Sequence, residues 1–206
     1  SGMLFKAGKR VENCAFSNAL YLEEAILGEG ITVLPYGAFK HCFALKKVTL
    51  PDTITLFDTL IDKFLTSEYD TNIGAQFEMC QSLEEIILPS NLEYIPAKTF
   101  SDCLSLKKVV IPDSVTDFLQ GILITLSATT GQITVKDVNS VTFSNCDSLE
   151  SIVLPQNLKT IPTRTFYNCD NLTEVYIPGS VTQIKEEAFK KREKLESVII
   201  GTDRQI

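Results

Sequence analysis

The chain has 206 residues, of which 44% are hydrophobic, so it is long enough to bury a sizeable core as one domain or one elongated array. Its 26 acidic and 19 basic residues give a net charge of −7, which argues against a nucleic-acid partner because phosphate backbones need a basic face. The sequence holds no run of about 18 apolar residues, and therefore predicts no transmembrane helix.

The N-terminal stretch lacks an apolar signal-peptide core, and residues 1–3 resemble the remnant of an expression tag. Leu4 precedes Leu27 by 23 residues, a spacing that recurs through the whole chain. We therefore expect the chain to start inside a strand and to be a segment cut from a longer array, with a poorly capped first coil.

A phenylalanine marks a repeat along the chain. Most successive copies are 23 residues apart, and two intervals are longer by 15 and by 20 residues. The copies are Phe16, Phe39, Phe77, Phe100, Phe143, Phe166 and Phe189. The unit reads F-x2-C-x2-L-x2-[VI]-x-[IL]-P, and a fixed period of this length is typical of stacked repeat architectures.

One unit shows the physical logic of all of them. In AFKHCFAL, Phe39, Cys42 and Leu45 are three residues apart, which places them on one side of a short helix or 3₁₀ turn. Val48 and Leu50 then alternate with period two, as inward residues of a strand do, and the following proline ends that strand. One such coil cannot bury its apolar side alone, whereas stacked coils share a continuous core.

The strand block occurs seven times, and parallel neighbours about 4.8 Å apart would form a sheet about 29 Å long. The blocks are Leu22–Leu27, Leu45–Leu50, Leu83–Leu88, Leu106–Ile111, Leu149–Leu154, Leu172–Ile177 and Leu195–Ile200. The last helical stretch, EEAFKKREKLES, leads into the final block and is expected to serve as a C-terminal cap that faces water.

This motif resembles the BspA-like leucine-rich repeats found in surface proteins of bacteria and of some protozoan parasites. The resemblance covers nearly the whole chain, and we expect residues 1–206 to form a single domain. It implies an α/β solenoid, a right-handed and curved array of about seven coils, with a parallel sheet on one face and short helices or 3₁₀ turns opposite. It also implies binding or adhesion rather than catalysis, although this fold carries many binding functions.

Two insertions interrupt the array within residues 58–76 and 119–142, both between the second extended segment and the phenylalanine. In the second insertion, ILITL and ITVKDV flank SATTGQ, which predicts a β-hairpin. The bases of the two insertions lie two coils, or about 10 Å, apart, so the inserts could form one lateral lobe. The alternative is a drift in loop length that costs little.

Five of the six cysteines share one slot of the repeat, and only Cys14 lies outside it. The slot residues are Cys42, Cys80, Cys103, Cys146 and Cys169. We expect them to fill the core as small buried hydrophobic residues. Disulfides between neighbouring coils, such as Cys80–Cys103, are one alternative, and a metal or catalytic role is another.

The sequence points to no active site and to no cofactor. His41 adjoins Cys42, but neighbouring residues on a turn point apart, so we expect Cys42 in the core and His41 towards solvent. There is no CxxC motif and only one histidine, which disfavours a zinc site. No catalytic residue, metal ligand or enzymatic activity is therefore predicted.

The outward face of the sheet is the predicted binding surface. Its first column begins with Glu24, Lys47, Glu85 and Lys108, whose charges alternate from strand to strand, and it includes Glu174. The next column is almost entirely apolar and comprises Ile26, Thr49, Ile87, Val110, Val153, Tyr176 and Ile199. A continuous exposed apolar stripe often marks an interaction site, and the alternative is plain β-propensity.

These observations predict an extracellular or cell-surface module that binds a protein or a glycan through this face, extended by the insertions. The alternative is a structural spacer or stalk whose ends associate with further repeats and present other domains.

Overall fold

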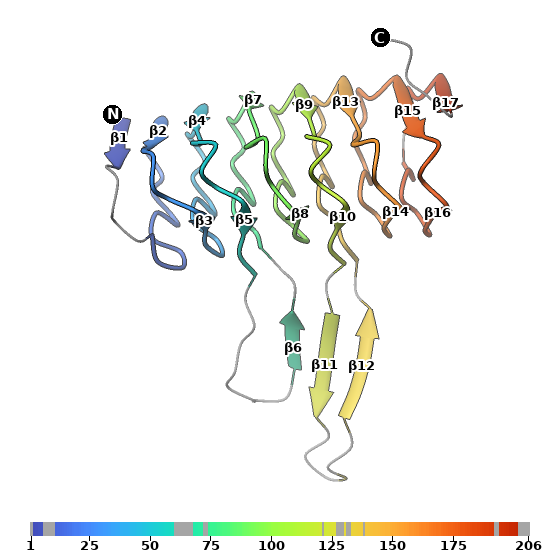
Figure 1. The fold of residues 1–206 in the computed structure, drawn as a ribbon, viewed down its shortest axis with the longest axis horizontal. Coiled ribbons are helices and arrows are strands. Elements are labelled where there is room, and N and C mark those ends of the chain that lie inside the picture. Colours follow the sequence, from blue (N-terminus) through green and yellow to red (C-terminus); the bar gives the residue numbers. More distant parts are fainter. Residues whose placement is uncertain are drawn as a thin grey trace.

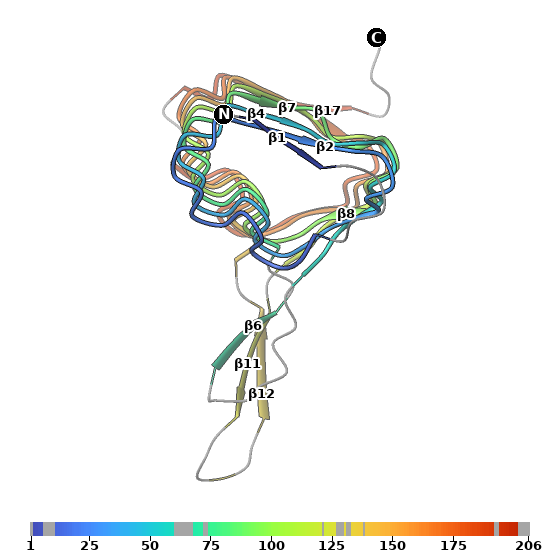
Figure 2. The same cartoon turned by 90° about the vertical axis from the view of Figure 1, so that its left-hand side faces the viewer.

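The computed structural model describes residues 2–5, 11–59, 68–71, 74–120, 122–126, 130, 133–137, 139–191 and 194–201. The chain winds into stacked coils that follow one another along the long axis of the molecule (Figure 1). Viewed down that axis, the coils superimpose into a ring, with the main sheet on one side and a lobe hanging from another (Figure 2). The predicted solenoid is confirmed.

One side of the solenoid, called the main sheet below, carries all seven predicted strand blocks, with six turns of the solenoid between them. Its strands are β2 (Glu24–Leu27), β4 (Lys47–Thr49), β7 (Glu85–Ile86), β9 (Lys108–Val110), β13 (Ser151–Val153), β15 (Glu174–Pro178) and β17 (Ser197–Gly201). An eighth strand, β1 (Gly2–Phe5), precedes them as expected, but Phe5 rather than Leu4 pairs with Leu27. The spacing across this pair is therefore one residue shorter than predicted.

The parallel ladder is not continuous, contrary to the prediction of one uninterrupted sheet. Strands β1, β2, β4, β7, β9 and β13 form a six-stranded sheet, and β15 and β17 form a separate pair. The coils nevertheless stack across the break, because the rings of Phe143 and Phe166 lie 5.4 Å apart and the Phe143 N–H donates to the Thr165 carbonyl at 2.9 Å. Where the ladder stops, core packing and hydrogen bonds between the turns therefore hold neighbouring coils together.

A second row of two-residue strands lies on a different side of the ring (Figure 2). It consists of β3 (Val33–Leu34), β5 (Leu56–Phe57), β8 (Tyr94–Ile95), β10 (Asp117–Phe118), β14 (Thr160–Ile161) and β16 (Gln183–Ile184). These strands pair in parallel two at a time. The second residue of most of them is buried, so this row closes the core opposite the main sheet.

Turns replace the short helices on the remaining side. Throughout residues 11–59, 74–120, 139–191 and 194–201, the backbone forms no helix. The Cys42 N–H donates to the Phe39 carbonyl at 3.1 Å, closing a single i→i+3 turn. Gly37 and His41 flank Phe39 with φ values of 59°, in the left-handed region. A right-handed helix cannot continue through such residues, so the helical option is not confirmed.

Left-handed backbone recurs at the same two positions of every unit, two residues before and two residues after the phenylalanine. The earlier position holds Cys14, Gly37, Ala75, Lys98, Val141, Arg164 and Glu187. The later position holds Asn18, His41, Met79, Asp102, Asn145, Asn168 and Lys191. Asparagine and aspartate, which tolerate this conformation best after glycine, occupy four of the later positions. The turn thus repeats as faithfully as the strand.

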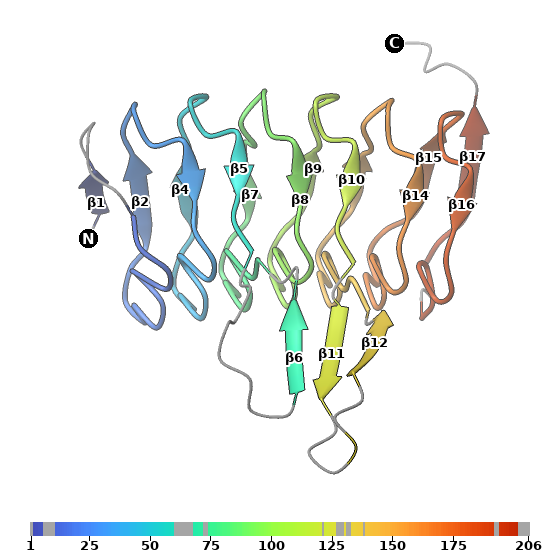
Figure 3. The same cartoon turned by 60° about the horizontal axis from the view of Figure 1, so that its bottom comes forward.

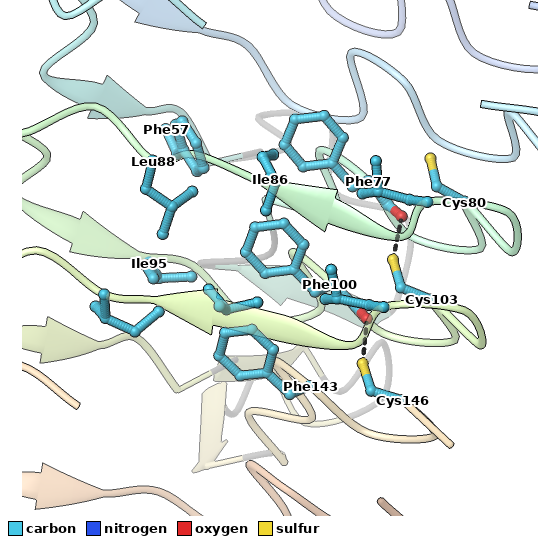
Figure 4. Close-up of a cluster of buried hydrophobic side chains, with 14 of the residues drawn as sticks. Phe57, Phe77, Cys80, Ile86, Leu88, Ile95, Phe100, Cys103, Phe143 and Cys146 are labelled. Carbon is cyan, nitrogen blue, oxygen red and sulfur yellow. Dashed lines mark hydrogen bonds between the residues drawn. The ribbon is translucent and has the colours of Figure 1, made fainter. Parts of the chain in front are cut away.

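The core is a column of stacked phenylalanine rings. The seven repeat phenylalanines contact one another in sequence, with ring centroids 5.2 to 5.6 Å apart. Phe77, Phe100 and Phe143 lie one above another beside the cysteine column (Figure 4). Offset-stacked aromatic pairs of this kind contribute about 0.5–1.5 kcal/mol beyond their buried area. The ring column therefore links each coil to the next.

A buried polar row runs beside the middle rings, at the residue before Phe77, Phe100, Phe143 and Phe166. Thr99 is fully buried, and its hydroxyl lies 2.8 Å from the Pro96 carbonyl and 3.1 Å from Gln76 Oε1. The Gln76 amide in turn donates to the Asp58 carbonyl at 2.7 Å. Buried polar groups cost free energy unless they are hydrogen-bonded, and these are.

The two insertions meet in one lobe, which is one of the two arrangements that the sequence left open. β11 (Ile122–Leu126) and β12 (Ile133–Asp137) of the second insertion form the predicted antiparallel hairpin. β6 (Glu68–Thr71) of the first insertion adds antiparallel to the free edge of β11, pairing Tyr69 with Ile124. The result is a three-stranded sheet in the order β12–β11–β6 that projects from the solenoid (Figure 3).

Candidate binding surface

The main sheet turns one set of side chains to the core and the other to solvent. In β9, Val109 is fully buried, whereas Lys108 and Val110 on either side of it are exposed. β4 follows the same pattern. The charged and apolar columns predicted from the sequence therefore lie side by side on the outward face.

Exposure along the apolar column is uneven. Ile87 is 84% exposed, Val110 50%, Ile199 44% and Ile26 37%, whereas Val153 and Tyr176 are half-buried. The two most exposed apolar side chains of the column therefore lie just after β7 and in β9, in the middle of the array.

Tyr176 faces outward but does not offer its ring freely. A side chain added at Gly201 would come within 2.6 Å of the Tyr176 hydroxyl, so the tyrosine lies close against the end of β17. Its hydroxyl is buried and has no hydrogen-bond partner among the residues that the structure describes. This tyrosine packs on its neighbouring strand more than it presents a contact surface.

A groove of about 340 Å³ opens between β7 and β9. Within the described chain, the ladder between these strands holds one registered pair, Glu85 with Lys108. Ile87, Val110 and Pro112 line the groove beyond this pair. The groove thus joins an apolar floor to a charged border.

The charged border alternates in sign across the strands, as predicted. Along this column, Lys47 approaches Glu24, with Nζ and Oε1 3.9 Å apart. Exposed pairs at such distances contribute little to stability. The column therefore sets the pattern of surface charge more than it holds the strands together.

A second charged column, one residue earlier in each unit, was missed by the sequence analysis. Lys46 Nζ lies 3.3 Å from Glu23 Oε2, and Lys107 Nζ lies 2.8 Å from Glu84 Oε2. The signal was available, because both pairs are separated by 23 residues. The prediction considered the residues directly before and after each buried strand position, and these side chains lie one position earlier in the chain.

The Lys107–Glu84 hydrogen bond has a clear electrostatic effect. It lowers the pKa of the Glu84 carboxyl below its usual range and raises the pKa of the Lys107 ammonium. Both side chains are exposed to solvent, so water screens the interaction. The lysine and the glutamate of each such pair therefore neutralise each other, and they do not pair with the neighbouring column.

The repeat geometry and the chain's comparison with protein families agree. The family of the BspA type leucine rich repeat region matches residues 9–124 and 122–205, in six copies. The chain belongs to this family. Leucine-rich-repeat solenoids of this kind are scaffolds whose extended surfaces typically bind other proteins.

Solved structures of bacterial leucine-rich repeat proteins share the fold of this chain. A leucine-rich repeat protein from Bacteroides ovatus aligns with a TM-score of 0.69 at 20% identity, over 95% of this chain and 45% of that one. One from T. pallidum aligns with a TM-score of 0.60 at 22% identity, over 98% and 74%. One from Eubacterium ventriosum has a TM-score of 0.52 at 18% identity, over 100% and 61%. The chain thus spans less than half the Bacteroides ovatus protein. A search of curated proteins found no match.

The cysteine column of this BspA-type array fills the core, as predicted, and also makes hydrogen bonds. All five slot cysteines are fully buried free thiols. Each thiol lies 3.0 to 3.2 Å from the carbonyl of the phenylalanine one coil earlier. Figure 4 shows two of these bonds, from Cys103 to Phe77 and from Cys146 to Phe100. The cysteine at this slot therefore fills space in the core and also donates a hydrogen bond to a buried backbone carbonyl.

Burial makes these thiols poor nucleophiles. It raises the pKa of Cys42 from 9.0 to about 11, and it raises the pKa of Cys103 further. The thiolate is the reactive form, so little of it exists near neutral pH. The sixth cysteine, Cys14, is an exposed free thiol at a left-handed turn position.

His41 and Cys42 point apart, as the sequence analysis expected. The imidazole Nδ1 lies 3.3 Å from Asn18 Oδ1, and the ring stacks on Phe43 at 6.0 Å, whereas the Cys42 thiol faces the core. Across the described residues, no group of three or more potential ligand side chains is placed to hold a metal ion. The same residues include no helix long and apolar enough to span a membrane.

Proposed function

We propose that this chain is a non-catalytic binding module, secreted or displayed at a cell surface, that engages a protein or a glycan through the outward face of its main sheet. The observation that carries the proposal is the exposure of Ile87, at 84%, next to Val110. Large apolar side chains grouped on one face with a charged border are typical of interaction sites. The surface location is supported by the family to which the chain belongs.

The lobe extends the proposed contact region to a second side of the solenoid. Its three strands come from insertions two coils apart that meet through the pairing of β6 with β11. Random drift in loop length would not require two separate insertions to share one sheet. Insertions in solenoids that cluster on one side often contribute to binding.

The test is a double substitution, Ile87→Asp with Val110→Asp. Both side chains point into solvent, so the charges should not disturb the core. The labelled chain is screened on an array of purified extracellular proteins and glycans, and each ligand it retains is then offered to the variant. We expect binding to fall at least tenfold, with unchanged circular dichroism and thermal midpoint.

Ile184→Asp is the matched control. The exposed fraction of this isoleucine, 44%, is similar to the 50% of Val110. It lies on β16, in the second row of strands, and not on the main sheet. The control should bind as the unmodified chain does. Retention of the ligand by a folded double variant would exclude the outward sheet face as the site.

A second function, as a spacer whose coils associate end to end, is favoured by a separate observation. In β17, Val198 is 47% and Ile200 69% exposed, although the equivalent Val175 and Ile177 of the preceding coil are buried. The charged stretch predicted as a cap leaves these side chains uncovered. An exposed apolar edge strand is a template for pairing with another strand.

Sedimentation equilibrium over a hundredfold range of concentration tests this second function. If coils stack end to end, the weight-average mass of the unmodified chain should rise with concentration. The mass of the double variant Val198→Lys with Ile200→Lys should stay at the value of a monomer. A mass that is constant in both proteins would exclude it.

A further inference from the structure

We infer that the groove between β7 and β9 accepts an extended segment of a partner protein that carries a side-chain carboxylate two residues from a large apolar side chain. In this arrangement Lys108 binds the carboxylate, and the apolar side chain covers Ile87 and Val110. The inference rests on the proposed function and names the chemistry of its partner.

Among the lysines of this face that the structure describes, Lys108 is the one whose side chain has no partner. Lys46 and Lys107 form ion pairs at 3.3 and 2.8 Å, and Lys47 leans towards Glu24 at 3.9 Å. For Lys108, the described part of the chain shows neither an ion pair nor a hydrogen bond with its side chain. Its ammonium group is therefore free to pair with a charge from outside.

The order of charges along the column explains why Lys108 is left over. Glu85 is registered with Lys47 on one side and with Lys108 on the other, so cations flank it. On its far side, Lys108 is registered with Ser151, which carries no charge. The alternation stops there, and the last cation has one carboxylate for a neighbour instead of two.

The surroundings favour an anionic occupant over a cationic one. A charged depression of about 460 Å³ adjoins the apolar groove. It is lined by Lys46, Lys47, Glu84, Glu85, Lys107 and Lys108, four lysines against two glutamates, in a chain whose net charge is −7. The groove and this depression share Glu85 and Lys108. A basic partner group placed at Glu85 would meet the flanking lysines, whereas a carboxylate at Lys108 would not meet an excess of acid.

The spacing of the two subsites matches an extended chain. Lys108 and Val110 are two residues apart on the same face of β9, which puts them about 6.6 Å apart along the strand. Side chains two apart on an extended partner segment have the same spacing. A segment that runs along β9 therefore sets its acidic and apolar side chains over Lys108 and over the Ile87–Val110 floor.

The probe is a library of random octapeptides displayed on phage and selected on the immobilised chain. We expect enriched sequences to share Asp or Glu two residues from Leu, Ile, Phe, Tyr or Trp. A synthetic peptide of the enriched sequence, acetylated and amidated so that its termini carry no charge, then serves for affinity measurements. Lys108→Glu should weaken its binding about tenfold, since each 1.4 kcal/mol of a charge-assisted contact is a factor of ten.

Selection on the Lys108→Glu variant supplies the decisive comparison. Its enriched peptides should exchange the acidic residue for Lys or Arg and keep the apolar one. Lys159→Glu makes the same charge change at an exposed site outside the groove and should leave the acidic preference intact. An unchanged preference on Lys108→Glu, or a selection without any acidic preference, would overturn the inference.

Ile87→Asp separates failure of the inference from failure of the proposed function. If the selected peptides no longer bind this variant while Lys108→Glu has no effect, the sheet face is the site and only its assigned chemistry is wrong. If they bind Ile87→Asp unchanged, the peptides use another surface and both proposals fail. Ligands found only on the glycan array would also overturn the inference while leaving the proposed function in place.

Discussion

Replacing Phe100 by alanine tests whether the ring column holds the solenoid together. The Phe100 ring is fully buried between Phe77, at 5.5 Å and an interplanar angle of 4°, and Phe143, at 5.2 Å and 12°. Truncating a buried phenylalanine costs about 3–5 kcal/mol, through lost burial and the cavity left behind. Two stacked neighbours lie on opposite sides of this ring, so we expect the upper part of that range.

Phe43→Ala removes the same atoms at the surface and serves as the control. Its ring is 36% exposed and stacks on His41 at 6.0 Å, outside the column. Its loss should cost about 1 kcal/mol or less. The free energy of unfolding is obtained from urea titrations followed by far-ultraviolet circular dichroism, because the chain has no tryptophan.

The shape of the transition adds a second observable. Each coil contacts only its neighbours, so stability in a solenoid approximates a sum over coils and their interfaces. Weakening both interfaces of the Phe100 coil should broaden the transition or split it in two. Equal losses for the two alanine variants, or a loss below about 1 kcal/mol for Phe100→Ala, would refute the role assigned to the column.

Four further outcomes are expected from the buried thiols, the charge pairs and the lobe. Iodoacetamide at pH 8 should modify Cys14 in the folded chain and the column cysteines only after denaturation. Rapid modification of Cys42 in the folded chain, detected by mass spectrometry, would contradict the packing. Because burial raises the pKa of Cys42 from 9.0 to about 11, its neutral thiol favours the folded state. That contribution is complete below pH 9 and should be lost as the pH rises towards 11, so denaturation titrations of Cys42→Ala should show a weaker decline over this window. Carbon-detected NMR should show the pKa of Glu84 returning towards 4.5 in Lys107→Met, and no change would mean that the pair does not persist in solution. Ile124→Pro should remove β-sheet protection in the lobe, since proline cannot donate to the ladder of a central strand, while amide exchange in the solenoid stays slow; loss of protection in both would show that the lobe supports the coils.

The periodic parts of this protein could be predicted from the sequence because they are local. A strand alternates with period two, so the buried Val109 and the outward Lys108 and Val110 follow from their order in the chain. The 23-residue spacing repeats one solution to the burial of a coil, and this is why the core phenylalanines, the cysteine slot and the seven strand blocks were all found. The hairpin in the second insertion was also visible, as two apolar runs around a polar turn.

Other features depend on contacts that no single repeat encodes. The left-handed residues on both sides of each phenylalanine turn the expected helices into turns, because backbone pairing between coils holds that conformation. The charge column of Lys107 was missed because the prediction considered only the two positions next to the buried residue of each strand. The exposures of Ile87 and Tyr176 differ strongly although they share one column, because neighbouring strands cover the tyrosine and leave the isoleucine open.

The sequence by itself determined the repeat, its core and the face that meets solvent, since each of these follows from spacing within one unit. Only the tertiary structure decided where on that face the apolar surface collects, which cation remains unpaired, and that β6 joins β11 across about fifty residues of chain. These depend on how neighbouring coils stand against each other in three dimensions. Stacking distance and register set them, and neither is contained in the order of residues within a single coil.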